Sequence, residues 1–122
     1  GGMGRDHNKL TVFAMADELV VQVYWATRGF PVDERYGLRS QIRRGAVSVP
    51  TNVVEGCARR SIREYLHFVS VALGSASEVR YLLGLSSRLK LLEPSICAPL
   101  AQRYDELVRA LQRLTDALAQ KA

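Results

Sequence analysis

Arginine is the residue type whose number and spacing in this chain most clearly indicate chemistry. Three arginines follow one another at intervals of four residues, a fourth stands beside the last of them, and three more cluster further along. Guanidinium groups bind phosphate and carboxylate through paired hydrogen bonds, so this pattern indicates a polyanion-binding surface. A solvated basic face without a ligand is the alternative. The candidate nucleic-acid-binding residues are Arg35, Arg39, Arg43, Arg44, Arg59, Arg60 and Arg63.

The distribution of charge favours the same interpretation. The net charge is +5, but the segment from Arg35 to Lys90 holds ten basic residues and only three acidic ones, a net charge of +7. A positive surface concentrates polyanions around itself whatever the fold. The sequence contains no helix-turn-helix, zinc-finger or RNA-binding signature, so we expect contact with the RNA or DNA backbone and not with particular bases.

A second motif, Glu64-Tyr65-Leu66-His67, matches the Glu-x-x-His pair that supplies metal ligands in di-iron carboxylate bundles. Such a site needs a second pair, whereas the only other histidine is His7. Glu64 is also explained by a helix-capping box with Ser61. No serine or cysteine has an evident base and orienting group beside it. We therefore expect no metal, no cofactor, no catalytic residue and no enzymatic activity.

A third group of polar residues surrounds Pro50. Three of them share one face of a helix beside the proline, and two belong to the next helix. Since Pro50 clashes with the carbonyl of Ala46, we expect the polar groups to satisfy that carbonyl and to pair across the two helices. A ligand site is the alternative. This structural polar motif comprises Ser48, Asn52, Glu55, Ser75 and Glu78.

Apolar residues at helical spacing predict four helices that position these groups. The first runs from about Thr11 to Arg28, and the second from Asp33 to Gly56 with a kink near Pro50, unless the proline divides it into two short helices. The third starts at Ser61 and the fourth after Glu93-Pro94-Ser95. Short connections favour an all-α, antiparallel, up-down-up-down four-helix bundle. The fourth helix shows the clearest seam: Leu100, Tyr104, Leu107, Leu111, Leu114 and Leu118.

The first helix has apolar residues on more than one side. One predicted core stripe consists of Phe13, Ala16, Val20, Val23, Tyr24 and Thr27. A second set lies off this stripe, and a four-helix bundle has no central helix that could bury both sets. We therefore expect self-association, with Leu19, Val21 and Trp25 as candidate interface residues.

Length and composition fit one domain over residues 10–122. We expect residues 1–9 to be a flexible segment, and Gly1-Gly2 before Met3 is typical of an expression scar. No apolar run approaches the roughly 20 residues that span a bilayer, so we expect no membrane contact. Without a secretory signal, the expected location is the cytoplasm. Cys57 and Cys97, without a CxxC pair, fit buried thiols better than a disulfide or zinc site.

One further set of residues is typical of a known family: Phe30-Pro31, Glu34-Arg35-Tyr36-Gly37-Leu38, Gln41-Ile42-Arg43-Arg44, Ser48-Val49-Pro50, Asn52, Glu55-Gly56, Ser75 and Glu78. Through these residues the sequence resembles the bacterial four-helix bundle proteins named after intervening sequences in 23S ribosomal RNA genes. The family includes the accessory variability protein of diversity-generating retroelements. The resemblance implies an antiparallel bundle that assembles into a ring-like homopentamer. For the retroelement members it also implies binding of nucleic acid and of a reverse transcriptase through a basic surface.

Two functions are therefore expected from the sequence. The first is a homo-oligomeric bundle that binds nucleic acid through its arginines. The second is an interaction scaffold whose basic surface docks an acidic protein partner without nucleic acid.

Overall fold

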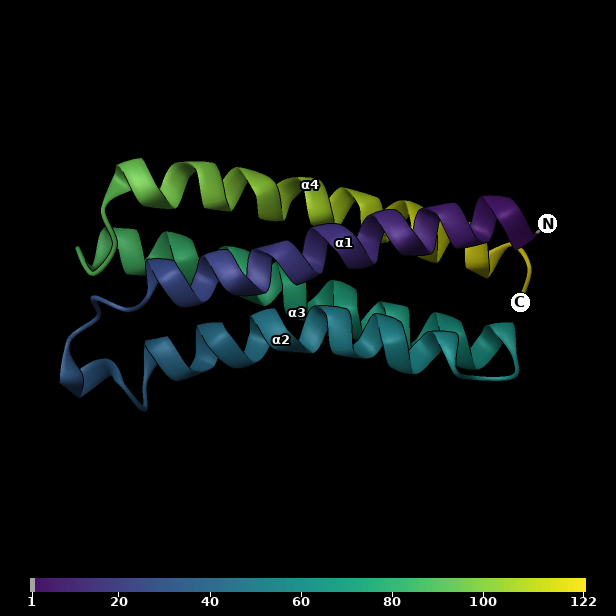
Figure 1. Cartoon of the computed structure of the whole chain (residues 1–122), viewed down its shortest axis with the longest axis horizontal. Helices are drawn as coiled ribbons and strands as arrows, with labels where there is room; N and C mark the ends of the chain where they lie inside the picture. The colour runs from purple at the N-terminus through teal and green to yellow at the C-terminus, as the bar shows by residue number, and fades with distance from the viewer. Residues whose placement is uncertain (1) are drawn as a thin grey trace.

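The computed structural model describes the backbone of residues 2–122 and the side chains of residues 9–122. Four α-helices and a short 3-10 turn make up the described chain, which contains no strand. In Figure 1 the four helices lie side by side along the long axis of the molecule. The bounds are α1 Gly2–Ala26, η1 Val32–Glu34, α2 Leu38–Cys57, α3 Ile62–Arg88 and α4 Pro94–Ala119.

The helices form a four-membered ring in which each contacts only its two neighbours. The contacting pairs are α1 with α2, α2 with α3, α3 with α4, and α4 with α1. Figure 1 shows both chain ends at the same end of the molecule. The predicted all-α class with four helices is confirmed, and the contacts fit the predicted up-down-up-down order.

Two helix boundaries differ from the prediction. The helix α1 begins at Gly2 and not near Thr11, so it includes most of the segment that was expected to be flexible; Gly1 lies outside the described residues. No proline interrupts the sequence before Thr11. The helix α2 begins at Leu38, because Asp33 and its neighbours form the separate turn η1.

Only part of the predicted stripe of α1 faces the core: Ala16, Val23 and Thr27 are buried as predicted. Leu19 and Val23 are fully buried, whereas Tyr24 is 41% exposed and Val20 only half-buried. Leu19, a candidate interface residue, is therefore core, and that assignment was wrong. The error arose because α1 carries several apolar stripes at helical spacing, and periodicity alone does not rank them. The buried stripe is Val12, Ala16, Leu19, Val23 and Thr27.

The helices α2 and α3 approach closely because glycines face α3. A Cβ atom added at Gly45 would lie 2.7 Å from Val79 Cγ2, and one at Gly56 would lie 2.9 Å from Tyr65 Cδ1. Both distances are shorter than van der Waals contact, so neither position accepts a side chain without movement of α3.

The proline in α2 does not divide the helix. Residues 38–57 form one helix through the buried Pro50, which excludes the two-helix alternative; the kink itself stays a prediction. Two side chains beside the proline donate hydrogen bonds to backbone carbonyls: Thr51 Oγ1 to Val47 at 2.7 Å and Asn52 Nδ2 to Ser48 at 2.8 Å. These acceptors differ from Ala46, whose carbonyl was expected to receive such a bond.

The third helix starts as predicted, whereas the fourth starts earlier: α4 begins at Pro94, inside the segment that was expected to precede it. The Ser61 hydroxyl accepts a hydrogen bond from the amide of Glu64 at 3.1 Å, which caps α3. By length and mean hydropathy α3 could cross a membrane, which the sequence analysis did not expect. A core helix passes the same test, and α3 packs between α2 and α4 here. Every residue of the predicted α4 seam is buried: Leu100, Tyr104, Leu107, Leu111, Leu114 and Leu118.

Candidate interaction surfaces

The seven candidate arginines lie in two groups at opposite ends of the bundle. The helix α2 has 20 residues, which corresponds to a length of about 30 Å. Arg39, Arg43 and Arg44 belong to its first two turns, with Arg35 before them, directly after the turn η1. The other group, Arg59, Arg60 and Arg63, lies at the turn into α3. The candidates therefore do not form one continuous patch.

The first group meets the C-terminal end of α1. Arg43 Nε donates to Thr27 Oγ1 at 2.9 Å, and Arg43 Nη2 donates to the carbonyl of Tyr24 at 3.1 Å. Its guanidinium also lies 4.4 Å from the centre of the Tyr24 ring. Arg28, in the turn that follows α1, lies 4.0 Å from the centre of the Trp25 ring. Tyr24, Trp25, Arg28 and Arg43 together line a shallow depression. We call this region, with Arg35, Arg39 and Arg44, the basic end.

The electrostatics of the basic end are those of unneutralised positive charge. Burial, and then the charge of Arg39, lower the pKa of Arg43, and Tyr24 offsets part of this shift. A guanidinium nevertheless stays protonated in proteins. Among the side chains of residues 9–122, no carboxylate forms an ion pair with any arginine of the basic end. The charge there is available to an anion from solution.

The second group of arginines is partly neutralised. Arg59 forms an ion pair with Glu55, and its guanidinium lies 4.7 Å from the centre of the Phe68 ring. Arg60 and Arg63 are exposed. Of the two groups, the basic end therefore presents the stronger positive field.

The predicted polar motif forms only in part. The hydroxyls of Ser48 and Ser75 are 2.8 Å apart and join α2 to α3. Asn52 Nδ2 donates to Ser48 Oγ at 2.9 Å as well as to the Ser48 carbonyl. Glu55 pairs with Arg59 instead, and Glu78 is exposed. Three of the five residues thus build a network between helices, which favours the structural interpretation over a ligand site.

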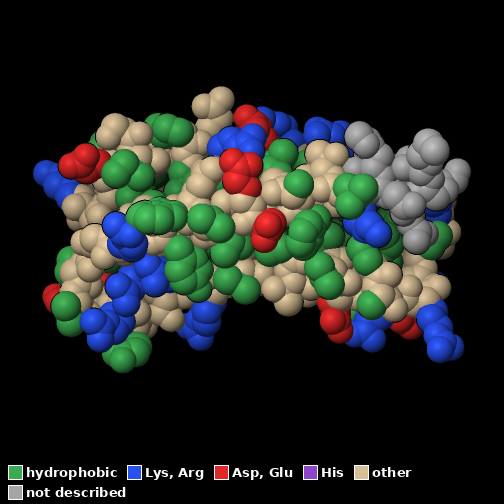
Figure 2. All heavy atoms as spheres, viewed as in Figure 1, with side chains coloured by type: hydrophobic (Ala, Val, Ile, Leu, Met, Phe, Trp, Pro, Cys, Tyr) green, Lys and Arg blue, Asp and Glu red, His purple; other side chains and the backbone are tan. Residues whose placement is uncertain are grey.

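An apolar surface extends over α1 and the neighbouring part of α2. Val21 is 55% exposed and Val54 is 54% exposed. A shallow depression between the two helices is lined by five apolar residues and three polar ones: Phe13, Val20, Val47, Pro50 and Val54, with Asp17, Thr51 and Glu55. Figure 2 shows hydrophobic side chains gathered along the middle of this side of the molecule, with basic side chains near its ends. We call it the α1–α2 face and define it by Leu10, Phe13, Val20, Val21, Val47 and Val54.

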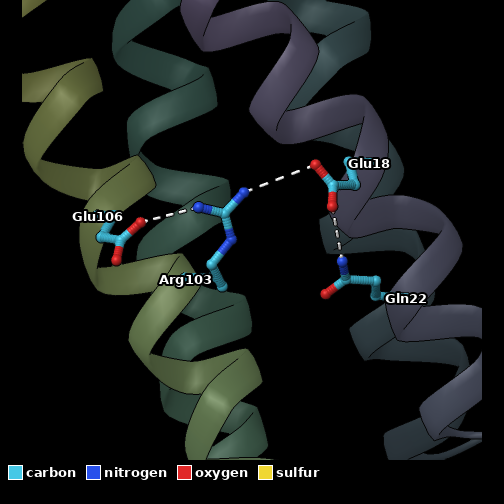
Figure 3. Close-up of polar contacts among 4 residues, drawn as sticks. All are labelled: Glu18, Gln22, Arg103 and Glu106. Atoms are coloured by element: carbon cyan, nitrogen blue, oxygen red, sulfur yellow. Dashed lines mark hydrogen bonds and ion pairs between the residues drawn. The ribbon is translucent and has the colours of Figure 1, made fainter.

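The side of α1 that faces α4 is mixed. Arg103 on α4 lies between two carboxylates, with Nη1 at 2.9 Å from Glu106 Oε2 and Nη2 at 3.6 Å from Glu18 Oε2. Gln22 Nε2 donates to Glu18 Oε1 at 3.0 Å. Figure 3 shows the four side chains joining α1 to α4. Beside this polar cluster the two helices share a depression with a mainly apolar lining: Gln22, Trp25, Ala26, Ile96, Pro99 and Leu100.

A family model described as 23S rRNA-intervening sequence protein matches residues 8–113. The chain belongs to this family. The match spans all four helices and includes both groups of arginines. The resemblance found in the sequence is confirmed. No curated protein matches the chain.

One solved structure shares the fold of this family member. It is the crystal structure of a protein of unknown function from the S23 ribosomal protein family of Bacteroides thetaiotaomicron, with 18% sequence identity and a TM-score of 0.82. The similarity covers 89% of this chain and 98% of that one. At this identity the comparison supports the four-helix fold and nothing about function.

The remaining candidate chemistry of this family member does not assemble into a site. Glu64 and His67 are both exposed, and His67 packs edge-on against Phe68. Within residues 9–122, no three side chains of the metal-binding types gather together. Cys97 is buried and donates through Sγ to the carbonyl of Leu83 at 3.3 Å, and Cys57 is a separate free thiol.

Arg28, which follows the end of α1, belongs to the basic end but was not among the candidate residues. Its contact with Trp25 could have been predicted from the sequence, because the two residues are three positions apart, the spacing at which helical side chains meet. Its proximity to Arg43 could not have been predicted, since it depends on how the end of α1 packs on α2.

Proposed function

We propose that this member of the 23S rRNA-intervening sequence protein family is a non-catalytic, homo-oligomeric bundle that binds the backbone of RNA or DNA. The observation that carries the proposal is the basic end, whose arginines have no acidic partner among residues 9–122. Phosphates bind such groups through paired, charge-assisted hydrogen bonds and release counterions from the nucleic acid as they do so.

Nucleic-acid binding is tested by fluorescence anisotropy with a labelled oligonucleotide over a salt series. Affinity should fall steeply as salt rises, because each phosphate contact releases a counterion. The double variant Arg39→Glu/Arg44→Glu should weaken binding and lower the salt slope by about one unit for each arginine that binds a phosphate. The matched control is Arg109→Glu/Arg113→Glu, which reverses the same charge on exposed residues of α4. Absence of binding at low salt would refute the proposal.

Arg43 is left out of the charge-reversal variants although it was a candidate. Its guanidinium bonds to Thr27 and to the carbonyl of Tyr24, so its replacement would also disturb the packing of α1. A drop in affinity in such a variant would not distinguish a missing phosphate interaction from a displaced helix.

Self-association is proposed through the α1–α2 face. Exposed Val21, Val47 and Val54 on adjacent helices are apolar area that a second copy would remove from water. The family resemblance gives a ring-like homopentamer as the expected state, with a mass of about 68 kDa for five chains of 13.6 kDa. Light scattering should show this mass for the native chain, and Val47→Asp should reduce it. A native chain that is monomeric at micromolar concentration would contradict this part of the proposal.

An acidic protein partner is the second candidate, because carboxylates also accept the paired hydrogen bonds of arginine. It predicts little affinity for nucleic acid and displacement of any bound oligonucleotide by polyglutamate at equal charge concentration. The salt series and this competition together decide between the two ligands.

A further inference from the structure

Exposed aromatic side chains accompany the arginines of the basic end. Trp25 is 62% exposed and Tyr36, three residues before Arg39, is 88% exposed, more than any other large hydrophobic residue of the described chain. Neither ring is needed by the core of the bundle. A role in binding is a reason for such rings to stay on the surface.

The rings and the guanidinium groups form stacked pairs. Arg28 lies over Trp25 at 4.0 Å and Arg43 over Tyr24 at 4.4 Å, and all four side chains line one depression. A flat aromatic ring beside a guanidinium plane offers a stacking surface together with a positive charge. Because Arg43 is held by Thr27 and the Tyr24 carbonyl, the pair of Arg43 and Tyr24 is in place before any ligand arrives.

We propose that the basic end recognises single-stranded nucleic acid, with unpaired bases stacking on Trp25 and Tyr36 while Arg28 and Arg39 contact the phosphates. This inference rests on the proposed function and names the form of its ligand. The faces of bases are accessible in a single strand and covered by their neighbours in a duplex. Stacking is tolerant of sequence, which agrees with the absence of a base-reading motif.

Charge alone would give the opposite preference. A duplex carries more charge per unit length than a single strand, and each contact to it releases more counterion, with salt slopes of about 0.9 against 0.7 per phosphate. A surface that used only its arginines would therefore bind duplex at least as tightly as single strand. A preference for the single strand requires contacts that the duplex does not offer.

Trp25 is thereby assigned to the basic end, whereas from the sequence it was a candidate for the oligomer interface, which we propose to be the α1–α2 face. Val21 precedes Trp25 by one helical turn, so the two surfaces adjoin. Each variant is therefore checked by light scattering. A change in assembly alters the affinity for both nucleic-acid forms, whereas the removal of a stacking ring alters the ratio between them.

The test compares a labelled 12-nucleotide oligo-dT strand with a duplex of the same length at one salt concentration. The native protein should prefer the single strand. Trp25→Ala and Tyr36→Ala should each weaken single-strand binding by roughly 5- to 100-fold and leave duplex binding nearly unchanged. Trp25→Phe should retain most of the preference. The control is Tyr81→Ala, which removes a 59% exposed ring from α3, a helix that does not contact α1.

Intrinsic fluorescence gives a second measurement that needs no variant. Trp25 is the single tryptophan of the chain, so a stacked base should quench the protein's indole emission on titration with oligo-dT, and the duplex should quench it less. Added salt should restore the emission.

The outcomes separate this inference from the proposed function. If the native protein binds both forms but neither ring affects the ratio of affinities, base stacking is refuted and backbone binding stands. If it binds duplex more tightly than single strand, the inference is also overturned. If it binds neither form at low salt, the proposed function fails and the inference fails with it.

Discussion

The replacement of Arg43 by methionine should destabilise the bundle although the residue lies at the surface. Methionine keeps an unbranched apolar side chain of similar length and removes the guanidinium. The variant therefore lacks the hydrogen bonds to Thr27 Oγ1 and to the Tyr24 carbonyl, and the interaction with the Tyr24 ring. These interactions join the end of α1 to α2.

The magnitude follows from the exposure of each interaction. The bond to Thr27 is partly buried, and a hydrogen bond from a charged group is worth about 1.5 kcal/mol at the lower end of its range. The bond to the Tyr24 carbonyl is exposed, so water replaces most of it. The cation–π interaction adds about 0.5 kcal/mol at an exposed position. Burial and the positive charge of Arg39 both destabilise the charged Arg43 side chain, and together they lower its pKa. The methionine variant lacks these two unfavourable effects, so its loss of stability is smaller than the sum of the lost interactions. The expected net destabilisation is about 1–2 kcal/mol.

Urea denaturation followed by circular dichroism at fixed protein concentration measures this destabilisation. With a denaturant slope near the middle of the range for small domains, the midpoint should fall by about 0.5–1 M. The control Arg44→Met removes the same charge from an exposed neighbour that has no such interactions among the described residues, and its free energy of unfolding should change by less than about 0.5 kcal/mol. Equal midpoints for the two variants would refute the structural role of Arg43.

Further predictions concern packing and ionisation. Gly56→Ala should destabilise by about 1–2 kcal/mol because its Cβ meets Tyr65, whereas Gly74→Ala, with open space around it, should stabilise by about 0.5–1 kcal/mol; urea midpoints of the two alanines should move in opposite directions. Burial raises the pKa of Tyr104, so the unfolded chain releases its phenolic proton first as the pH rises. The contribution of Tyr104 to the free energy of unfolding should therefore be fully present below pH ~10 and should decrease above it by up to ~1.4 kcal/mol per pH unit. In the Tyr104→Phe variant, the free energy of unfolding should decrease less steeply above this pH. Arg103→Met should cost less than about 1 kcal/mol, since its ion pairs are half-exposed, and a larger destabilisation at high salt would contradict this.

The fold was largely predictable from the sequence, because most helices carry a single apolar stripe bounded by clear start and stop signals. The α4 seam was predicted residue by residue, since polar residues separate its members on every turn. The helix α1 shows the limit of this reasoning. Its apolar residues occupy several sides, and the choice of Leu19 for the core depends on which side meets α2 and α4.

The candidate site was predictable only along one helix. The spacing of four among Arg35, Arg39 and Arg43 predicted that these residues lie together, and in the structure Arg39 and Arg43 are on α2 with Arg35 just before it. The net charge of a sequence segment contains no information about distances within the fold. It therefore did not predict that the length of α2, about 30 Å, separates the two groups of arginines. Nor does it reveal that Arg43 bonds to the end of α1, since those hydrogen bonds join residues 16 and 19 positions apart.

Three parts of the α1 surface have different roles, and their arrangement relates the proposed self-association to the proposed binding of nucleic acid. Its inner stripe builds the core, its outer apolar side belongs to the α1–α2 face, and its last turn contributes Trp25 to the basic end, with Arg28 just beyond the end of the helix. In a closed ring, rotational symmetry about a single axis carries the basic end of every copy to the same side of the assembly. A strand held at one basic end would then meet the next copy at high effective concentration. Modest stacking and phosphate contacts at each copy would therefore suffice for tight binding of a long strand, and assembly through α1 would be the step that makes the basic end effective.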